Sequence, residues 1–184
     1  MDKILHDNKW IQLLETDDGY VYSHEKRCGG EIIAVLPFKL VKTLTGDVFK
    51  YLARMEATPC HEGDKLKFTS ITGGVEECGI KASVIMELRE EAGVIATEDE
   101  LIELGFIYPS KSQDTKVYLF AMDITGKKVG EAVGDGSKHE ESAYVEWSSD
   151  SKMLVNCTDS FNIAIFARLA VHLIKEEEKE LNNG

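Results

Sequence analysis

One short acidic segment constrains this chain more than any other, because its carboxylates recur at helical spacing. Apolar side chains stand every four residues from Ile80 to Ala92, which predicts a single amphipathic helix. On that helix Glu87, Glu90 and Glu91 occupy positions i, i+3 and i+4, so three carboxylates share one face. Glu91 also falls on the apolar side, where its carboxylate is drawn toward the core. Like charges this close destabilise a helix unless a cation relieves them.

Two interpretations of this acidic face remain open at the level of the residues. A hard cation such as Mg²⁺ or Mn²⁺ would bind the carboxylate oxygens and remove their mutual repulsion. Alternatively, the face is simply solvated, and the helix ends at Gly93 because glycine is a common C-cap residue.

The same residues resemble a known family motif. Residues 86–94 read M-E-L-R-E-E-A-G-V and are similar to the second half of the Nudix box, R-E-U-x-E-E-x-G-U, where U is an aliphatic residue. The pair Gly73-Gly74 stands where that box begins. The chain is therefore similar to the Nudix family at every glutamate, aliphatic position and glycine of this half of the motif.

The first half of the box departs from the family pattern. Met86 stands in the place of the box arginine, which usually orients the first metal-binding glutamate. The segment from Gly73 to Glu87 is one residue shorter than in the family, or two shorter if the box begins at Gly74. Glu76 and Glu77 lie just before the place of the early glutamate. These differences bear on catalytic rate more than on fold.

Beyond the box, the resemblance is to the ADP-ribose pyrophosphatases and covers about 150 residues. The similar segments are two core strands, the strand and turn after the box, an acidic loop with its strand, and the start of the last helix: residues 30–38, 49–57, 106–110, 139–147 and 158–160. The resemblance implies an α/β fold, namely an α/β/α sandwich on a mixed β-sheet with an N-terminal β-hairpin. It also implies two parts: a ribbon at 1–28, which in this subfamily often reaches a partner subunit, and a Nudix domain at 29–184.

Local patterns predict where the elements lie. Asp17-Asp18-Gly19 predicts a hairpin turn between strands at 10–14 and 20–23. Apolar periodicity predicts a last helix at 159–180, capped by Asp159 or Ser160. The other predictions are strands at 31–41, 48–57, 66–72, 101–108 and 116–123, and a glycine-rich loop at 126–139.

The resemblance implies metal-dependent hydrolysis of the pyrophosphate bond in a nucleoside diphosphate linked to another moiety. ADP-ribose is the leading substrate, with AMP and ribose 5-phosphate as products. The implied ligands of Mg²⁺ or Mn²⁺ are Glu87, Glu90 and Glu91, with the backbone carbonyl at Gly73 as a further ligand. Glu90 and Glu91 are also implied to be catalytic.

One more acidic residue is expected from the later loop, as a base or a ligand. Glu141 is the first candidate, because it stands in the matching place before the strand at 145–147, and Glu140 is the second. The alternative is that both side chains only solvate the loop.

The expected substrate-binding residues are less sharply defined. Arg54 lies on the strand where the subfamily carries a phosphate-binding arginine, and Gly74 begins the box segment. Phe106 and Tyr108 could stack on a base, as could Trp10. For Phe106, core packing is the preferred interpretation.

Two other functions remain open. A Nudix-fold domain could bind a nucleotide or an NAD-related ligand without turnover, as a sensor or interaction module, and Met86 favours this hypothesis. The other is the hydrolysis of damaged nucleoside triphosphates, but the resemblance outside the box favours the ADP-ribose branch of the family.

Composition limits the partners and the compartment. A net charge of −12 argues against a nucleic-acid-binding surface. Residues 1–10 are polar and charged, and no apolar run is long enough to span a bilayer, so we expect a cytoplasmic protein without a membrane partner. The four cysteines form no C-x-x-C pair, which disfavours a zinc site or a disulfide. A homodimer is expected from the resemblance alone.

Overall fold

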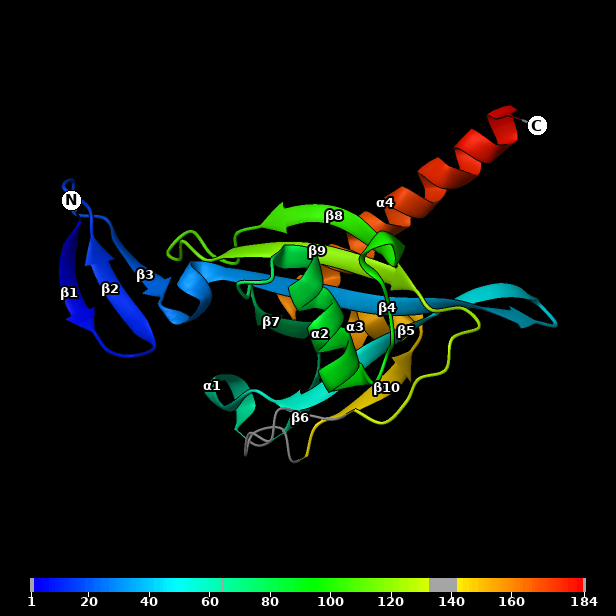
Figure 1. Ribbon diagram of the computed structural model, residues 1–184, viewed down its shortest axis with the longest axis horizontal. Helices are drawn as coiled ribbons and strands as arrows, with labels where there is room; N and C mark the ends of the chain where they lie inside the picture. Colours follow the sequence, from blue (N-terminus) through cyan, green and yellow to red (C-terminus); the bar gives the residue numbers. More distant parts are fainter. Residues whose placement is uncertain (1, 64, 133–141, 184) are drawn as a thin grey trace.

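The computed structural model describes residues 2–63, 65–132 and 142–183. Within these ranges the chain forms a central seven-stranded sheet, with helices on both faces, and a separate three-stranded sheet at the N-terminus (Figure 1). No helix in these ranges is long and apolar enough to cross a membrane.

Two long strands, β4 (Glu31–Thr43) and β5 (Gly46–Ala57), organise the central sheet. β4 pairs in parallel with β9 (Lys116–Asp123) on one edge. On its other edge β4 pairs antiparallel with β7 (Ile71–Gly74) and then with β5, so the sheet is mixed. The order is β10-β5-β4-β9-β8, with β6 beside β5 and β7 beside β4. The remaining strands are β6 (Leu66–Thr69), β8 (Leu101–Ile107) and β10 (Tyr144–Ser148).

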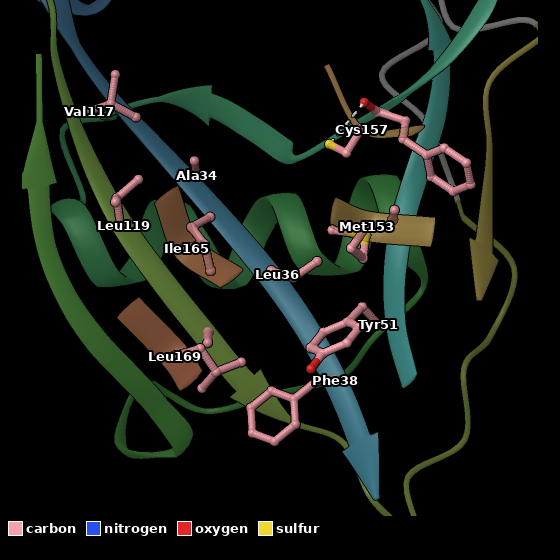
Figure 2. Close-up of a cluster of buried hydrophobic side chains, with 13 residues drawn as sticks. Ala34, Leu36, Phe38, Tyr51, Val117, Leu119, Met153, Cys157, Ile165 and Leu169 are labelled. Atoms are coloured by element: carbon pink, nitrogen blue, oxygen red, sulfur yellow. Dashed lines mark hydrogen bonds between the residues drawn. The ribbon is translucent and has the colours of Figure 1, made fainter. Parts of the chain in front are cut away.

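Each face of the sheet carries its own hydrophobic core. Ile33 and Val35 of β4 belong to the cluster under α2 (Ile80–Ala92). Ala34 and Leu36 point the other way, into the cluster under α4 (Ser160–Asn183), as Figure 2 shows. Because β4 is buried on both faces, its sequence is a nearly continuous apolar run. The predicted α/β/α layering on a mixed sheet is confirmed.

The N-terminal sheet has the predicted hairpin and one strand more. Its order is β1 (Lys3–Asp7), β2 (Ile11–Glu15) and β3 (Val21–Glu25). Gly19 has φ +85° in the hairpin turn, a conformation that glycine adopts at little cost. The Ser23 N–H of β3 donates to the Ser112 carbonyl at 2.9 Å, which joins this sheet to the loop before β9. The division at residue 28 remains a prediction.

One predicted strand, at 66–72, is wrong because the structure breaks it into β6 and β7 at Ser70. The backbone N–H and the hydroxyl of Ser70 both donate to one carboxylate oxygen of Asp159, at 2.7 and 2.6 Å. The other carboxylate oxygen of Asp159 accepts from the Phe161 N–H at 3.1 Å, which confirms Asp159 as the cap of α4. The distant side chain of Asp159 therefore stabilises the corner between β6 and β7.

Several short elements were not predicted: α1 (Pro59–Glu62), α3 (Asp150–Asn156), and the 3₁₀ helices η1 (Arg27–Gly30) and η2 (Glu98–Glu100). The predicted loop at 126–139 lies partly outside the described residues, and its described part, 126–132, contains no helix or strand.

Candidate functional site

The acidic face of α2 is built as the sequence predicts. The helix spans Ile80–Ala92 and ends at Gly93, whose φ of +61° and N–H bond to the Arg89 carbonyl at 3.1 Å confirm it as the C-cap. Val84, Leu88 and Ala92 of its apolar stripe are fully buried against the sheet, and Ile80 is partly buried. The carboxylates on the acidic side differ in exposure: Glu87 and Glu90 are half-buried, whereas Glu91 is 8% exposed.

Gly73 of β7 lies directly beneath the Glu87 carboxylate. A Cβ added to Gly73 would stand 1.9 Å from Oε1 and 2.3 Å from Cδ of Glu87, so no larger residue fits without displacing that side chain. The glycine is needed here for close approach, since its φ is not positive. The structure therefore brings together a carboxylate and the backbone position that the sequence predicted as joint metal ligands.

Arg54 places a cation beside one carboxylate of the acidic face, that of Glu91. Its side chain is 3% exposed, and its Nη1 lies 3.4 Å from Oε1 of Glu91. Its Nε donates to Oε2 of Glu56 at 3.0 Å. The predicted phosphate-binding arginine thus faces carboxylates of its own chain in this conformation. Of these two contacts, residue spacing indicates only the one between Arg54 and Glu56, because both residues lie on one face of β5.

A preformed metal cluster is not seen. Across residues 2–63, 65–132 and 142–183, no group of three or more His, Cys, Asp or Glu side chains is placed to hold an ion. Glu140 and Glu141 lie outside these ranges. The donor chemistry nevertheless fits a hard cation, since Glu87 and Glu90 offer only oxygen ligands and both are partly exposed, with Glu87 packed directly on the backbone of β7.

A hollow of about 420 Å³ opens at the glycine pair. Gly74 admits Cys28 to this hollow, because a Cβ at Gly74 would lie 2.8 Å from the Cys28 Cβ. Cys28 has φ +47°, and burial, followed by the nearby Glu25 carboxylate, raises the pKa of its thiol. The hollow at the glycine pair is lined by Glu25, Arg27, Cys28, Ile32, Thr72, Gly73, Gly74 and Glu76. Arg27 and Glu25 were not predicted as site residues, because no spacing in the sequence links them to the Nudix box.

The predicted aromatic pair lies elsewhere. Phe106 lines a different hollow, of about 510 Å³, beside the N-terminal end of α2, whereas the three carboxylates stand in its C-terminal half. Phe106 is 44% exposed, so its interpretation as a core residue is wrong. Its ring contacts Tyr108 edge to face at 5.7 Å, and the Lys116 ammonium lies 4.4 Å from its centre. The structure does not bring this pair to the glycine hollow.

Solved structures resemble most of the chain, although neither a protein-family model nor a curated protein sequence matches it. An ADP compounds hydrolase superposes with a TM-score of 0.66 at 13% identity, over 96% of this chain and 93% of that one. A mutT/nudix family protein from Listeria innocua gives 0.58 at 12%, over 80% and 95%. The NUDIX domain of Shewanella oneidensis NrtR, complexed with ADP ribose, gives 0.58 at 11%, over 78% and 87%. The chain has the Nudix fold.

Proposed function

We propose that this protein is a hydrolase of the Nudix type, dependent on Mg²⁺ or Mn²⁺. Its substrate is a nucleoside diphosphate linked to another moiety, with ADP-ribose cleaved to AMP and ribose 5-phosphate. One observation carries the proposal: the acidic face of α2 is seated on the backbone of β7, with Glu87 packed on Gly73. The fold shared with an ADP compounds hydrolase and with an ADP-ribose-bound domain supports the choice of substrate.

Each residue of the site has a distinct part in this proposal. Glu87, Glu90 and Glu91 would hold the ion, together with the backbone carbonyl at Gly73. A bound ion would neutralise the diphosphate and activate water. Arg54 orients the Glu91 carboxylate through the contact at 3.4 Å. Glu141, or Glu140 in second place, is proposed as the base that accepts the proton of the attacking water.

The reaction is an in-line displacement that gives two phosphomonoesters. The water oxygen forms a bond to one phosphorus while the bridging oxygen leaves with the other phosphate. The proton of the water passes to the base, and charge develops on the departing phosphate. Acidic residues alone would repel such a substrate, so the proposal requires the cation.

Specific observations favour a second function, ligand binding without turnover. Met86 replaces the arginine that the family uses for orientation, and it is exposed. Arg54 already neutralises Glu91, so the pocket can be stable without an ion. A sensor or interaction domain for a nucleotide or NAD-related ligand would have these properties.

Product analysis separates the two functions. Purified protein and Mg²⁺ are incubated with ADP-ribose, NADH, diadenosine polyphosphates and nucleoside triphosphates, and the products are resolved by chromatography. We expect AMP from ADP-ribose, a loss of at least about 100-fold in rate for Glu91→Gln, and no loss for Glu177→Gln on the exposed end of α4. No turnover of any substrate, with ligand still bound, would establish the binding function instead.

The N-terminal segment, residues 1–28, is proposed to join two copies of this protein. Ile11, Leu13 and Val21 are each about 40% exposed on one face of its sheet, where strand alternation puts them together. A small sheet that exposes apolar side chains gains by pairing with a second copy.

A further inference from the structure

A pair of sulfur atoms joins α2 to the loop that precedes it. The Cys78 thiol points to the Met86 thioether, and the two sulfur atoms lie 3.8 Å apart. Both side chains are exposed, Met86 at 43%. Neither belongs to the two hydrophobic clusters that the described residues form, so core packing does not account for the contact. Met86 also stands where the family motif has an arginine, which makes a sulfur atom at this place a feature of this chain.

The loop that carries Cys78 is fixed on the helix by hydrogen bonds. The Glu76 N–H donates to Oγ of Ser83 at 2.9 Å, and the same hydroxyl donates to the Gly79 carbonyl at 2.8 Å. The Gly79 N–H donates in turn to the Glu76 carbonyl at 3.0 Å. Gly79 has φ +100°, which lets the chain turn into the helix at this point. Because Ser83 is 1% exposed, these bonds are shielded from water, and the two sulfur atoms are held close together in advance.

The other cysteines of the chain are poorer candidates for a metal ligand. Burial is the main cause that raises the pKa of the Cys28 and Cys157 thiols, which disfavours the thiolate form that binds metals. Cys60 is exposed, as Cys78 is. Within the part of the chain that the structure describes, however, only the Cys78 thiol has a second sulfur atom in contact.

The chemistry of these two donors selects a particular class of ion. Thiolate and thioether sulfur are soft ligands, which favour Cu(I) over hard cations such as Mg²⁺. A bond between a first-row metal ion and a thiolate is about 2.3 Å long, so a linear site needs its sulfur atoms about 4.6 Å apart. The sulfur atoms of Cys78 and Met86 must therefore separate by about 0.8 Å from their present distance. The three rotatable bonds of a methionine side chain allow this movement.

We propose that Cys78 and Met86 form a binding site for a soft monovalent metal ion, namely Cu(I). The ion binds between Sγ and Sδ, the thiol proton is released to solvent, and copper keeps its oxidation state. This site differs in ligand chemistry from the acidic face of α2, where Glu87 and Glu90 offer oxygen atoms to a hard cation. Copper binding here does not depend on the proposed hydrolysis, so either proposal can fail alone.

Competition for Cu(I) tests the site without any measurement of activity. Bicinchoninate forms a coloured complex with Cu(I), and loss of this colour reports transfer of the ion to the protein under anaerobic conditions with ascorbate. We expect the native chain to withdraw one equivalent. Met86→Leu keeps a similar volume but lacks sulfur, and it should raise the Kd at least about 10-fold. Cys78→Ser should abolish the transfer, whereas Cys60→Ser is the matched control and should leave it unchanged.

X-ray absorption at the copper edge identifies the ligand atoms independently. The native chain should show two sulfur neighbours around the ion, and Met86→Leu should show one. Circular dichroism of the metal-free variants verifies that each is folded, which is expected because both side chains are exposed. Equal affinity of the native chain and Met86→Leu would overturn the site, since the thioether would then not bind the ion. Loss of transfer in Cys60→Ser would also overturn it, because the ion would then be held at Cys60.

Discussion

Gly73 illustrates how one absent side chain organises the candidate site. Its Cα faces the Glu87 carboxylate so closely that a methyl group would stand 1.9 Å from Oε1. Gly73→Ala must therefore move Glu87, although the backbone itself tolerates alanine there. We expect a fall of about 10- to 100-fold in ADP-ribose hydrolysis, which is typical when a residue that positions a ligand is lost.

A double-mutant cycle checks that the effect passes through Glu87. In a Glu87→Gln background, Gly73→Ala should add little, because the two changes remove the same feature. Steady-state rates of the four proteins provide the measurement. An equal loss in both backgrounds would show that Gly73 acts independently of the carboxylate.

Arg54 and Glu91 make a second residue-level prediction, which concerns stability. The pair is buried, at 3% and 8% exposed, so removing the cation leaves a carboxylate in a poorly solvated place. Arg54→Met should lower the free energy of unfolding by about 3–5 kcal/mol. Urea unfolding measures this, and Arg89→Met on the exposed side of α2 should stay within about 0.5 kcal/mol of the native protein. A similarly small effect of Arg54→Met would contradict the pairing.

Residue spacing could predict the site only where one element holds its residues together, whereas Gly73 and Arg54 were predicted from the family resemblance. Glu87, Glu90 and Glu91 follow from helical spacing alone, and their shared face is present. Arg54 reaches Glu91 across 37 positions, and nothing local marks that contact. The exposure of Phe106 was still harder to predict, because an aromatic residue in a strand suits both a core and a surface.

At the level of elements, the start of α4 offers the clearest prediction. Asp159 caps this helix and also accepts two hydrogen bonds from Ser70 at the β6–β7 corner. Asp159→Ala should cost about 1–2 kcal/mol for the cap alone, with a further loss for the corner. Thermal unfolding provides the measurement. Ser160→Ala is the control, since Ser160 is exposed, and equal effects of the two variants would refute the role of Asp159.

Element boundaries were predictable where periodicity is strong. α2 and β9 match their predicted ranges, Ile80–Ala92 and Lys116–Asp123, because apolar spacing defines both. The strand predicted at 66–72 fails at Ser70, since its partner Asp159 lies 89 residues away. β1 (Lys3–Asp7) has no alternating apolar pattern, and it is held as a strand by its antiparallel pairing with β2.

On the scale of the whole molecule, the proposed association of two copies has a direct test. Light scattering during gel filtration should give twice the 20.5 kDa of one chain. Leu13→Glu with Val21→Glu should shift the mass to that of the monomer, because two charges would be buried in the interface. A native protein that stays monomeric at all concentrations would rule out this use of the sheet.

The carboxylates on α2 are proposed to serve the hydrolysis of a diphosphate. The decisive measurement is a phosphorus NMR time course of ADP-ribose with Mg²⁺ and either the native protein or Glu91→Gln. We predict that the native protein replaces the diphosphate signals with those of two phosphomonoesters, and that chelation of the metal or the Glu91→Gln change stops this conversion. Diphosphate signals that persist with the native protein, or that vanish equally fast with Glu91→Gln, would contradict the account.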